Sequence, residues 1–94
     1  MYRPMRERDI EKYFRLQIKK RGGLALKFVS PEFSGVPDRL ILMKDKVPFF
    51  VEFKRPGGQL RARQEYVIRQ FEALGIKVLI IDSINKCNDE LQTL

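Results

Sequence analysis

Histidine and tryptophan are absent from the 94 residues, and cysteine occurs once, as Cys87. Without histidine the chain cannot form a His-dependent nucleophilic triad, a His-rich zinc site or a nuclease site with a histidine base. One cysteine forms neither an internal disulfide nor a zinc finger. No apolar run approaches the ~18 residues of a membrane span, and the N-terminal stretch lacks the apolar segment of a signal peptide. We therefore expect a cytoplasmic protein that does not span a membrane.

Acidic residues are scarce relative to basic ones. Nineteen Lys and Arg against twelve Asp and Glu give a net charge of +7. In so short a chain this excess favours a polyanionic partner, with nucleic acid first and an anionic membrane surface second. A merely basic surface is the simpler alternative.

The length predicts a single domain over residues 1–94 that opens with a basic arm at residues 1–6. Apolar periodicity and turn residues predict a helix, three strands, a helix, a strand and a helix, at residues 7–21, 24–29, 38–43, 47–54, 60–74, 76–82 and 83–91. The second and third strands should form an antiparallel hairpin, and the crossover helix should make the third and fourth strands parallel. The fold class is therefore α/β, a small mixed sheet flanked by helices in the order αβββαβα. The apolar run at 76–82 is typical of a strand buried on both faces.

Two charged residues interrupt the apolar strand PFFVEFK. Side chains alternate along a strand, so Glu52 and Lys54 project from the same face as Phe50. Burying unpaired charges is costly, so this strand end should open into a polar cleft. If the hairpin turns at Asp45 and Lys46, Asp38 lies near the same strand end as Glu52 or Phe53, and two carboxylates converge. The alternative is a solvated Glu and Lys on an edge strand.

Two adjacent carboxylates suit a hard divalent cation such as Mg²⁺. Asp38 and Glu52 are the predicted ligands, and the backbone carbonyl of Phe53 would add a third oxygen. Such an ion polarises a phosphate and acidifies a bound water, while Lys54 orients that water or offsets developing charge. The set therefore predicts metal-assisted phosphodiester hydrolysis.

Two further polar residues fit the same cleft. Gln64 falls on the sheet-facing stripe of its helix, where it would anchor Lys54 or a metal-bound water, or else satisfy a backbone group. Glu11, near the start of the first helix, would supply a carboxylate to a second metal or a shared water, or else be a solvated surface residue.

Basic residues are the candidates for DNA contact. Those expected to flank the cleft are Arg55, Arg61 and Arg63, and a second cluster comprises Lys19, Lys20 and Arg21. Gly57 and Gly58 would let the backbone approach a phosphate closely. Such residues position the phosphate backbone and do not read bases, which favours structure-selective binding. The alternative is that each is an ordinary solvated side chain.

Several of these motifs together resemble a known family. The segment GVPD with Asp38, the segment EFKRPGG with Glu52 and Lys54, the early Glu11 and the later Gln64 resemble the VRR-NUC (virus-type replication-repair nuclease) domain of the PD-(D/E)xK superfamily. The resemblance runs from about residue 7 to residue 82.

The resemblance implies a restriction-endonuclease-like fold, a requirement for Mg²⁺ or Mn²⁺ and no small-molecule cofactor. It implies catalytic roles for Glu11, Asp38, Glu52, Lys54 and Gln64. It also implies a homodimer that cuts branched DNA in the manner of a Holliday-junction resolvase, in a host cytoplasm if the protein is viral. The strand at 76–81 and the last helix are the candidate dimer surfaces.

Two other functions remain open. One is a non-catalytic nucleic-acid-binding module in which Asp38 and Glu52 only pair with nearby basic residues. The other is a sequence-specific restriction-type endonuclease. A nuclease should require metal at these carboxylates, whereas a plain binding module should be indifferent to EDTA.

Overall fold

A computed structural model describes residues 5–94, so residues 1–4 of the predicted basic arm lie outside the described residues. The elements are α1 (Glu7–Lys20), β1 (Leu24–Lys27), β2 (Arg39–Leu42), β3 (Phe49–Phe53), α2 (Ala62–Ala73), β4 (Val78–Ile81) and α3 (Ile84–Leu91). This order confirms the predicted αβββαβα class, with most predicted elements longer by a few residues than those observed. No helix in this part of the chain has the length and apolar content to cross a membrane.

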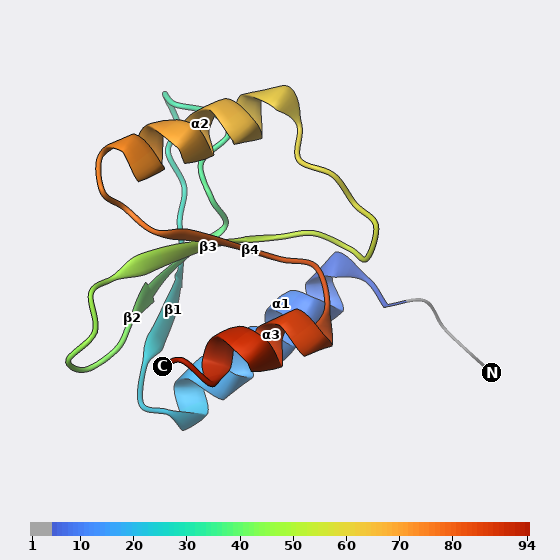
Figure 1. Cartoon of the computed structure of the whole chain (residues 1–94), viewed down its shortest axis with the longest axis vertical. Coiled ribbons are helices and arrows are strands. Elements are labelled where there is room, and N and C mark those ends of the chain that lie inside the picture. Colours follow the sequence, from blue (N-terminus) through green and yellow to red (C-terminus); the bar gives the residue numbers. More distant parts are fainter. Residues whose placement is uncertain (1–4) are drawn as a thin grey trace.

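The four strands form one mixed sheet in the spatial order β1-β2-β3-β4. β2 pairs antiparallel with both β1 and β3, and β4 pairs parallel with β3. The parallel pair is joined through α2, as a crossover requires. Figure 1 shows the sheet nearly edge-on, with α2 over one face and α1 and α3 over the other. One face of the sheet is therefore covered by two helices and the other by one.

The main hydrophobic core lies between the sheet and the pair α1 and α3. Ile10, Phe14 and Ile18 recur every four residues, so they share one face of α1, and all three are fully buried. They pack with alternate residues of β3, and the rings of Phe14 and Phe53 meet edge to face with centroids 5.8 Å apart. Since Phe53 faces this core, its neighbours Glu52 and Lys54 leave β3 on the opposite face.

A smaller cluster fills the space beneath α2. Phe50 of β3 contacts Phe28 and Phe71 edge to face, with centroid separations of 4.9 and 5.1 Å. Val67 and Ile68 of α2 are buried as well. Glu52 lies on this same face of the sheet with only 2% of its surface exposed, and within residues 5–94 it is the one buried residue that is polar or charged. The fold thus places a carboxylate beside an apolar cluster.

The prediction that residues 76–82 form a strand buried on both faces is wrong. β4 pairs only with β3 and is an edge strand. Ile76 and Ile80 are 37% and 38% exposed, because α2 covers this edge incompletely. A continuous apolar run does not by itself distinguish a central strand from an edge strand.

Candidate active site

Two carboxylates meet where β2 begins and β3 ends. Arg39 pairs with Val51, so the next position of the antiparallel register sets Asp38 across from Glu52. The Phe53 N–H donates to Asp38 Oδ2 at 2.9 Å, and the Phe28 N–H donates to the Asp38 carbonyl at 2.9 Å. These bonds fix Asp38 directly before the start of the central strand β2. The structure therefore brings together the two carboxylates that the hairpin prediction placed side by side.

The Phe53 carbonyl faces the same region. The N–H and C=O of a strand residue point to the same neighbouring strand, and the Phe53 N–H points to Asp38. The following N–H, that of Lys54, points the other way and donates to the Ile81 carbonyl at 3.0 Å. The Phe53 carbonyl oxygen is thus directed to the β2 side, where Asp38 lies.

Gln64 links the remaining polar groups. Its Oε1 accepts from Lys54 Nζ at 2.9 Å, and its Nε2 donates to Glu52 Oε2 at 3.0 Å. Lys54 Nζ also lies 3.5 Å from Glu52 Oε2. Only one orientation of the amide satisfies both partners, since a carboxylate needs a donor and an ammonium needs an acceptor. Gln64 therefore holds the lysine and the glutamate in fixed relation.

Gln64 also caps α2. Its Oε1 accepts from the Arg61 N–H at 2.9 Å, which satisfies a backbone group that the first turn of a helix leaves free. Two interpretations of Gln64 were open, an anchor for Lys54 and a partner for a backbone group, and the same side chain does both.

The pKa values of both carboxylates are raised above their ordinary values. Burial first, and the neighbouring Asp38 second, raise the pKa of Glu52 from 4.5 to about 7. Burial likewise raises the pKa of Asp38, although the hydrogen bond from Phe53 opposes the shift. The charge of Lys54 lowers both pKa values but does not cancel the effect. The site thus has an excess of negative charge that a bound cation would relieve.

The predicted Glu11 is tied to a different partner. Its Oε2 accepts from Arg39 Nε at 2.8 Å, and Arg39 Nη1 donates further to the Ala25 carbonyl at 3.2 Å. This ion pair joins α1 to β2 and β1. The charge of Glu11 still raises the pKa of Asp38, so the residue borders the site.

Glu7 was missed in the sequence. It lies one turn before Glu11 on the same side of α1. Its pKa is raised, first by burial of the carboxyl group and then by the charge of Asp38. The charge of Glu7 in turn raises the pKa of Glu52. Its spacing of four from Glu11 was the available signal, but an acidic residue in the first turn of a helix is usually explained by the helix dipole.

The site offers a hard cation three oxygen donors, which do not by themselves complete its coordination. No group of three or more His, Cys, Asp or Glu side chains within residues 5–94 is arranged to hold a metal ion. Gln64 and Lys54 both approach Glu52 Oε2, and within residues 5–94 no hydrogen bond is made to Glu52 Oε1. Two carboxylates and a backbone carbonyl, all oxygen donors, suit Mg²⁺ or Mn²⁺ completed by waters and a substrate phosphate.

The predicted DNA-binding residues fall into two groups. Near the site, Pro56 and Gly57 form a turn closed by the bond from the Gly58 N–H to the Arg55 carbonyl at 2.8 Å, and Gly57 has a φ of +78° that favours glycine. Arg55 and Arg61 are exposed on either side of this turn. Arg63 instead contacts the loop before β2, where its Nε donates to the Ser34 carbonyl at 3.0 Å.

The second group lies apart from the site. Lys19, Lys20 and Arg21 occupy the last turn and C-cap of α1. Glu7 and Glu11 are at the opposite end of this helix, and a helix of this length spans about 20 Å. The fold does not bring the second cluster to the carboxylates.

Comparison with known proteins agrees with this geometry. No family model matches the chain. The chain is 42% identical over 81 residues to "Putative nuclease p44" of Acyrthosiphon pisum secondary endosymbiont phage 1, covering 86% of this chain and 87% of that protein. A solved structure described as a VRR_NUC domain is similar with a TM-score of 0.85 and 25% identity, over 92% of this chain and 94% of the other. The chain belongs to the VRR-NUC family of nuclease domains.

Proposed function

We propose that this nuclease is a metal-dependent DNA endonuclease that acts as a homodimer on branched DNA. The observation that carries the proposal is the Asp38 and Glu52 pair, with Lys54 fixed beside it by Gln64. Such a set combines oxygen ligands with a positioned ammonium, which is what hydrolysis of a phosphodiester needs.

Asp38, Glu52 and the Phe53 carbonyl would hold Mg²⁺ or Mn²⁺. When bound, the ion supplies polarisation of the phosphate and a more acidic water. Lys54 then offers its remaining N–H groups to the attacking water or to a phosphate oxygen. Gln64 keeps that ammonium in place, because Gln64 Oε1 accepts a hydrogen bond from Lys54 Nζ. Glu7 and Glu11 both add negative charge from α1. Glu11 is paired with Arg39. We therefore assign to Glu7 the role of the α1 carboxylate that contacts a metal-bound water.

Phosphate contacts would be made by exposed groups around the cleft and at the far end of α1. We assign them to Arg55, Arg61, the backbone at Gly57 and Gly58, and the cluster Lys19, Lys20 and Arg21. Arg63 is instead bound to the loop before β2. None of these groups forms a base-reading motif, which favours recognition of DNA shape.

A homodimer would present two such sites to two strands. The exposed Ile76 and Ile80 on the edge of the sheet, together with α3, are the surface we propose for it. Light scattering after gel filtration should give twice the 11.1 kDa of one chain. The phage source of the similar nuclease fits action in a host cytoplasm.

The proposal is tested by cleavage of a labelled four-way junction and of a linear duplex with the same arms, each with Mg²⁺, Mn²⁺ or EDTA. The parent should make paired cuts in the junction only with metal. Asp38→Ala and Lys54→Ala should each abolish cutting. The matched controls are Glu32→Ala for Asp38→Ala and Lys44→Ala for Lys54→Ala. Each changes an exposed residue with the same charge as its counterpart and should cut like the parent.

The other outcomes separate the alternatives. Equal cutting of junction and duplex would keep the chemistry and reject the selectivity for branched DNA. Cutting of one linear duplex at one site would favour a restriction-type enzyme. Binding of DNA in EDTA with no cutting under any condition would leave a binding module.

A further inference from the structure

We infer that Arg63 is a positioning residue that fixes the two sides of the active site relative to each other. It clamps the loop of residues 28–38, which ends at Asp38, to the first turn of α2, which carries Gln64. The inference rests on the proposed function, since it concerns the same site. We call Arg63 with Phe33, Ser34 and Tyr66 the Arg63 clamp.

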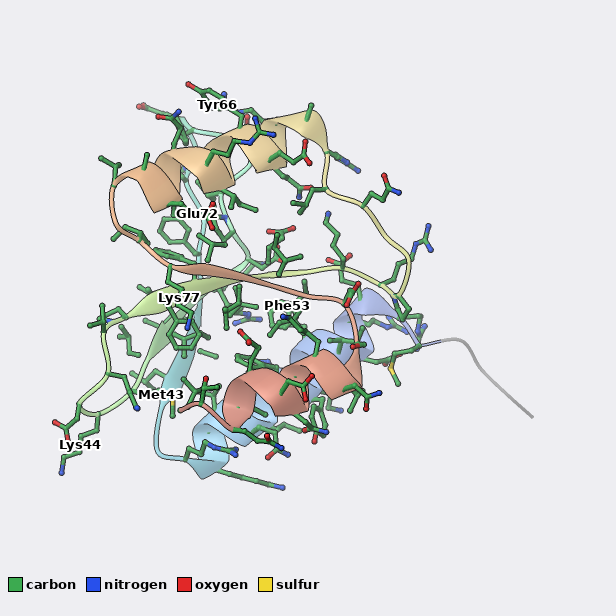
Figure 2. The ribbon with its side chains drawn as sticks, viewed as in Figure 1. Met43, Lys44, Phe53, Tyr66, Glu72 and Lys77 are labelled. Atoms are coloured by element: carbon green, nitrogen blue, oxygen red, sulfur yellow. The ribbon has the colours of Figure 1, made fainter. Side chains whose placement is uncertain are left out.

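The clamp is built from three contacts of one guanidinium. Arg63 Nε donates to the Ser34 carbonyl at 3.0 Å. The guanidinium carbon lies 4.7 Å from the ring centroid of Phe33 and 5.3 Å from that of Tyr66. Figure 2 shows Tyr66 on the side of α2 that faces away from the sheet. The Tyr66 ring of the clamp therefore lies on the outer side of α2.

Glycine at position 35 allows this approach. A Cβ there would lie 2.9 Å from Arg63 Cγ and 3.2 Å from the Arg63 carbonyl oxygen, closer than side chains normally pack. The φ of Gly35 is +87°, which also favours glycine. The loop thus contacts both the backbone and the side chain of Arg63.

The clamp is connected to both sides of the site by very short stretches of chain. Only Val36 and the fully buried Pro37 separate Gly35 from Asp38. On the other side Arg63 directly precedes Gln64, whose amide holds Glu52 and Lys54. A shift of the loop along α2 would therefore change the position of Asp38 relative to Gln64.

A clamp and a phosphate contact make different demands on the side chain. Stacking on two rings while donating to a carbonyl uses the planar fork of arginine, which lysine lacks. A phosphate contact needs positive charge, which lysine supplies. Arg63→Lys therefore separates the two roles, and Phe33→Leu removes a ring of the clamp without changing charge.

The experiment measures three quantities for the parent, Arg63→Lys and Phe33→Leu. These are kcat and KM on the junction with Mn²⁺, the Kd for junction DNA in EDTA, and the Mn²⁺ affinity of the protein alone by electron paramagnetic resonance. We expect both variants to lose about tenfold or more in kcat and several-fold in Mn²⁺ affinity, with the Kd for DNA within twofold of the parent. Arg69→Lys, an exposed position on the same helix, is the matched control and should behave like the parent.

Other results would overturn the inference. Unchanged kcat and Mn²⁺ affinity in both variants would show that the clamp positions nothing. Arg63 would instead be a phosphate contact if Arg63→Ala lost DNA affinity while Arg63→Lys kept the kcat, the Mn²⁺ affinity and the DNA affinity of the parent. Assays are run where circular dichroism shows each variant folded, and Tyr66→Leu, at a half-exposed ring, is an independent repeat. If the parent cuts no DNA, the proposed function fails, while the Mn²⁺ titration still tests the clamp.

Discussion

Glu52 is a buried carboxylate whose negative charge is only partly compensated by Lys54. Its neighbours in contact are the amide of Gln64 at 3.0 Å and the ammonium of Lys54 at 3.5 Å. Because its pKa rises from 4.5 to about 7 on folding, the folded protein holds a proton that the unfolded chain releases between these pH values. The free energy of unfolding should therefore fall as pH rises through this window.

We predict that Glu52→Gln abolishes this loss. The oxygen of the neutral amide still accepts from Gln64 Nε2, so the variant should exceed the parent in stability at pH 8 by up to about 3 kcal/mol and match it near pH 4. Urea unfolding at several pH values measures the difference. Glu32→Gln, at an exposed loop position, is the control. Its difference in free energy of unfolding from the parent should not change as pH rises through the range in which Glu52 titrates. A Glu52→Gln variant less stable than the parent at pH 8 would contradict the buried-charge argument.

Gln64 serves stability and chemistry through one amide. Gln64→Ala removes the cap on the Arg61 N–H and the bonds to Glu52 and Lys54. We expect a loss of about 1–2 kcal/mol in the free energy of unfolding and at least tenfold in kcat, with DNA affinity in EDTA unchanged. Denaturation and single-turnover cleavage measure these quantities, with the exposed Gln70→Ala as control. Retention of full activity would remove Gln64 from the site.

At the scale of elements, α1 carries two glutamates with separate tasks. Glu11 makes a half-buried ion pair with Arg39 that joins the helix to the sheet. Glu7 instead adds charge beside Asp38 and Glu52. One helix therefore anchors the domain at one turn and places a charge near Asp38 and Glu52 at the previous turn.

We predict opposite effects of the two neutral substitutions. Glu11→Gln should lower the free energy of unfolding by about 1–2 kcal/mol, because Arg39 loses its counter-charge. Glu7→Gln should leave stability at pH 8 equal or higher and lower kcat several-fold. Urea unfolding and cleavage of the junction with Mn²⁺ measure both variants in parallel. A stability loss in Glu7→Gln without a loss of kcat would reverse the assignment.

The elements also differ in how well the sequence predicts them. β3 was predictable because strict alternation assigns Phe49, Val51 and Phe53 to one face and Glu52 and Lys54 to the other. β4 was not, since an apolar run carries no information about which neighbours pair with it. The convergence of Asp38 and Glu52 followed from the hairpin register, which depends on local chain geometry.

Contacts between distant segments were beyond prediction. Arg63 was assigned to DNA as a basic residue near the cleft, yet its partners are 29 and 30 positions earlier, at Ser34 and Phe33. Likewise the pairing of Glu11 with Arg39 depends on how α1 crosses the sheet. Such contacts are set by tertiary packing, which neither periodicity nor residue type reveals.

At the scale of the whole molecule, the basic residues proposed to contact DNA lie in two separate regions. Arg55 and Arg61 lie beside the site, whereas Lys19, Lys20 and Arg21 lie about 20 Å away along α1. Because this separation exceeds the Debye length of about 8 Å at physiological salt, the two regions would contribute their proposed phosphate contacts independently. A duplex arm that reached the site and the far cluster together would be oriented as well as bound.

We therefore predict that Lys19→Ala, Lys20→Ala and Arg21→Ala combined weaken DNA binding without affecting the chemical step. Each lost phosphate contact should reduce the slope of log Kd against log salt by about 0.9, so the triple variant should lose up to about 2.7. Fluorescence anisotropy in EDTA at several salt concentrations measures the slope, and single-turnover cleavage at saturating DNA should give the rate of the parent. Arg61→Ala is the comparison beside the site. An unchanged slope in the triple variant would show that DNA does not reach this end of α1, and would confine the binding surface to the loop between β3 and α2.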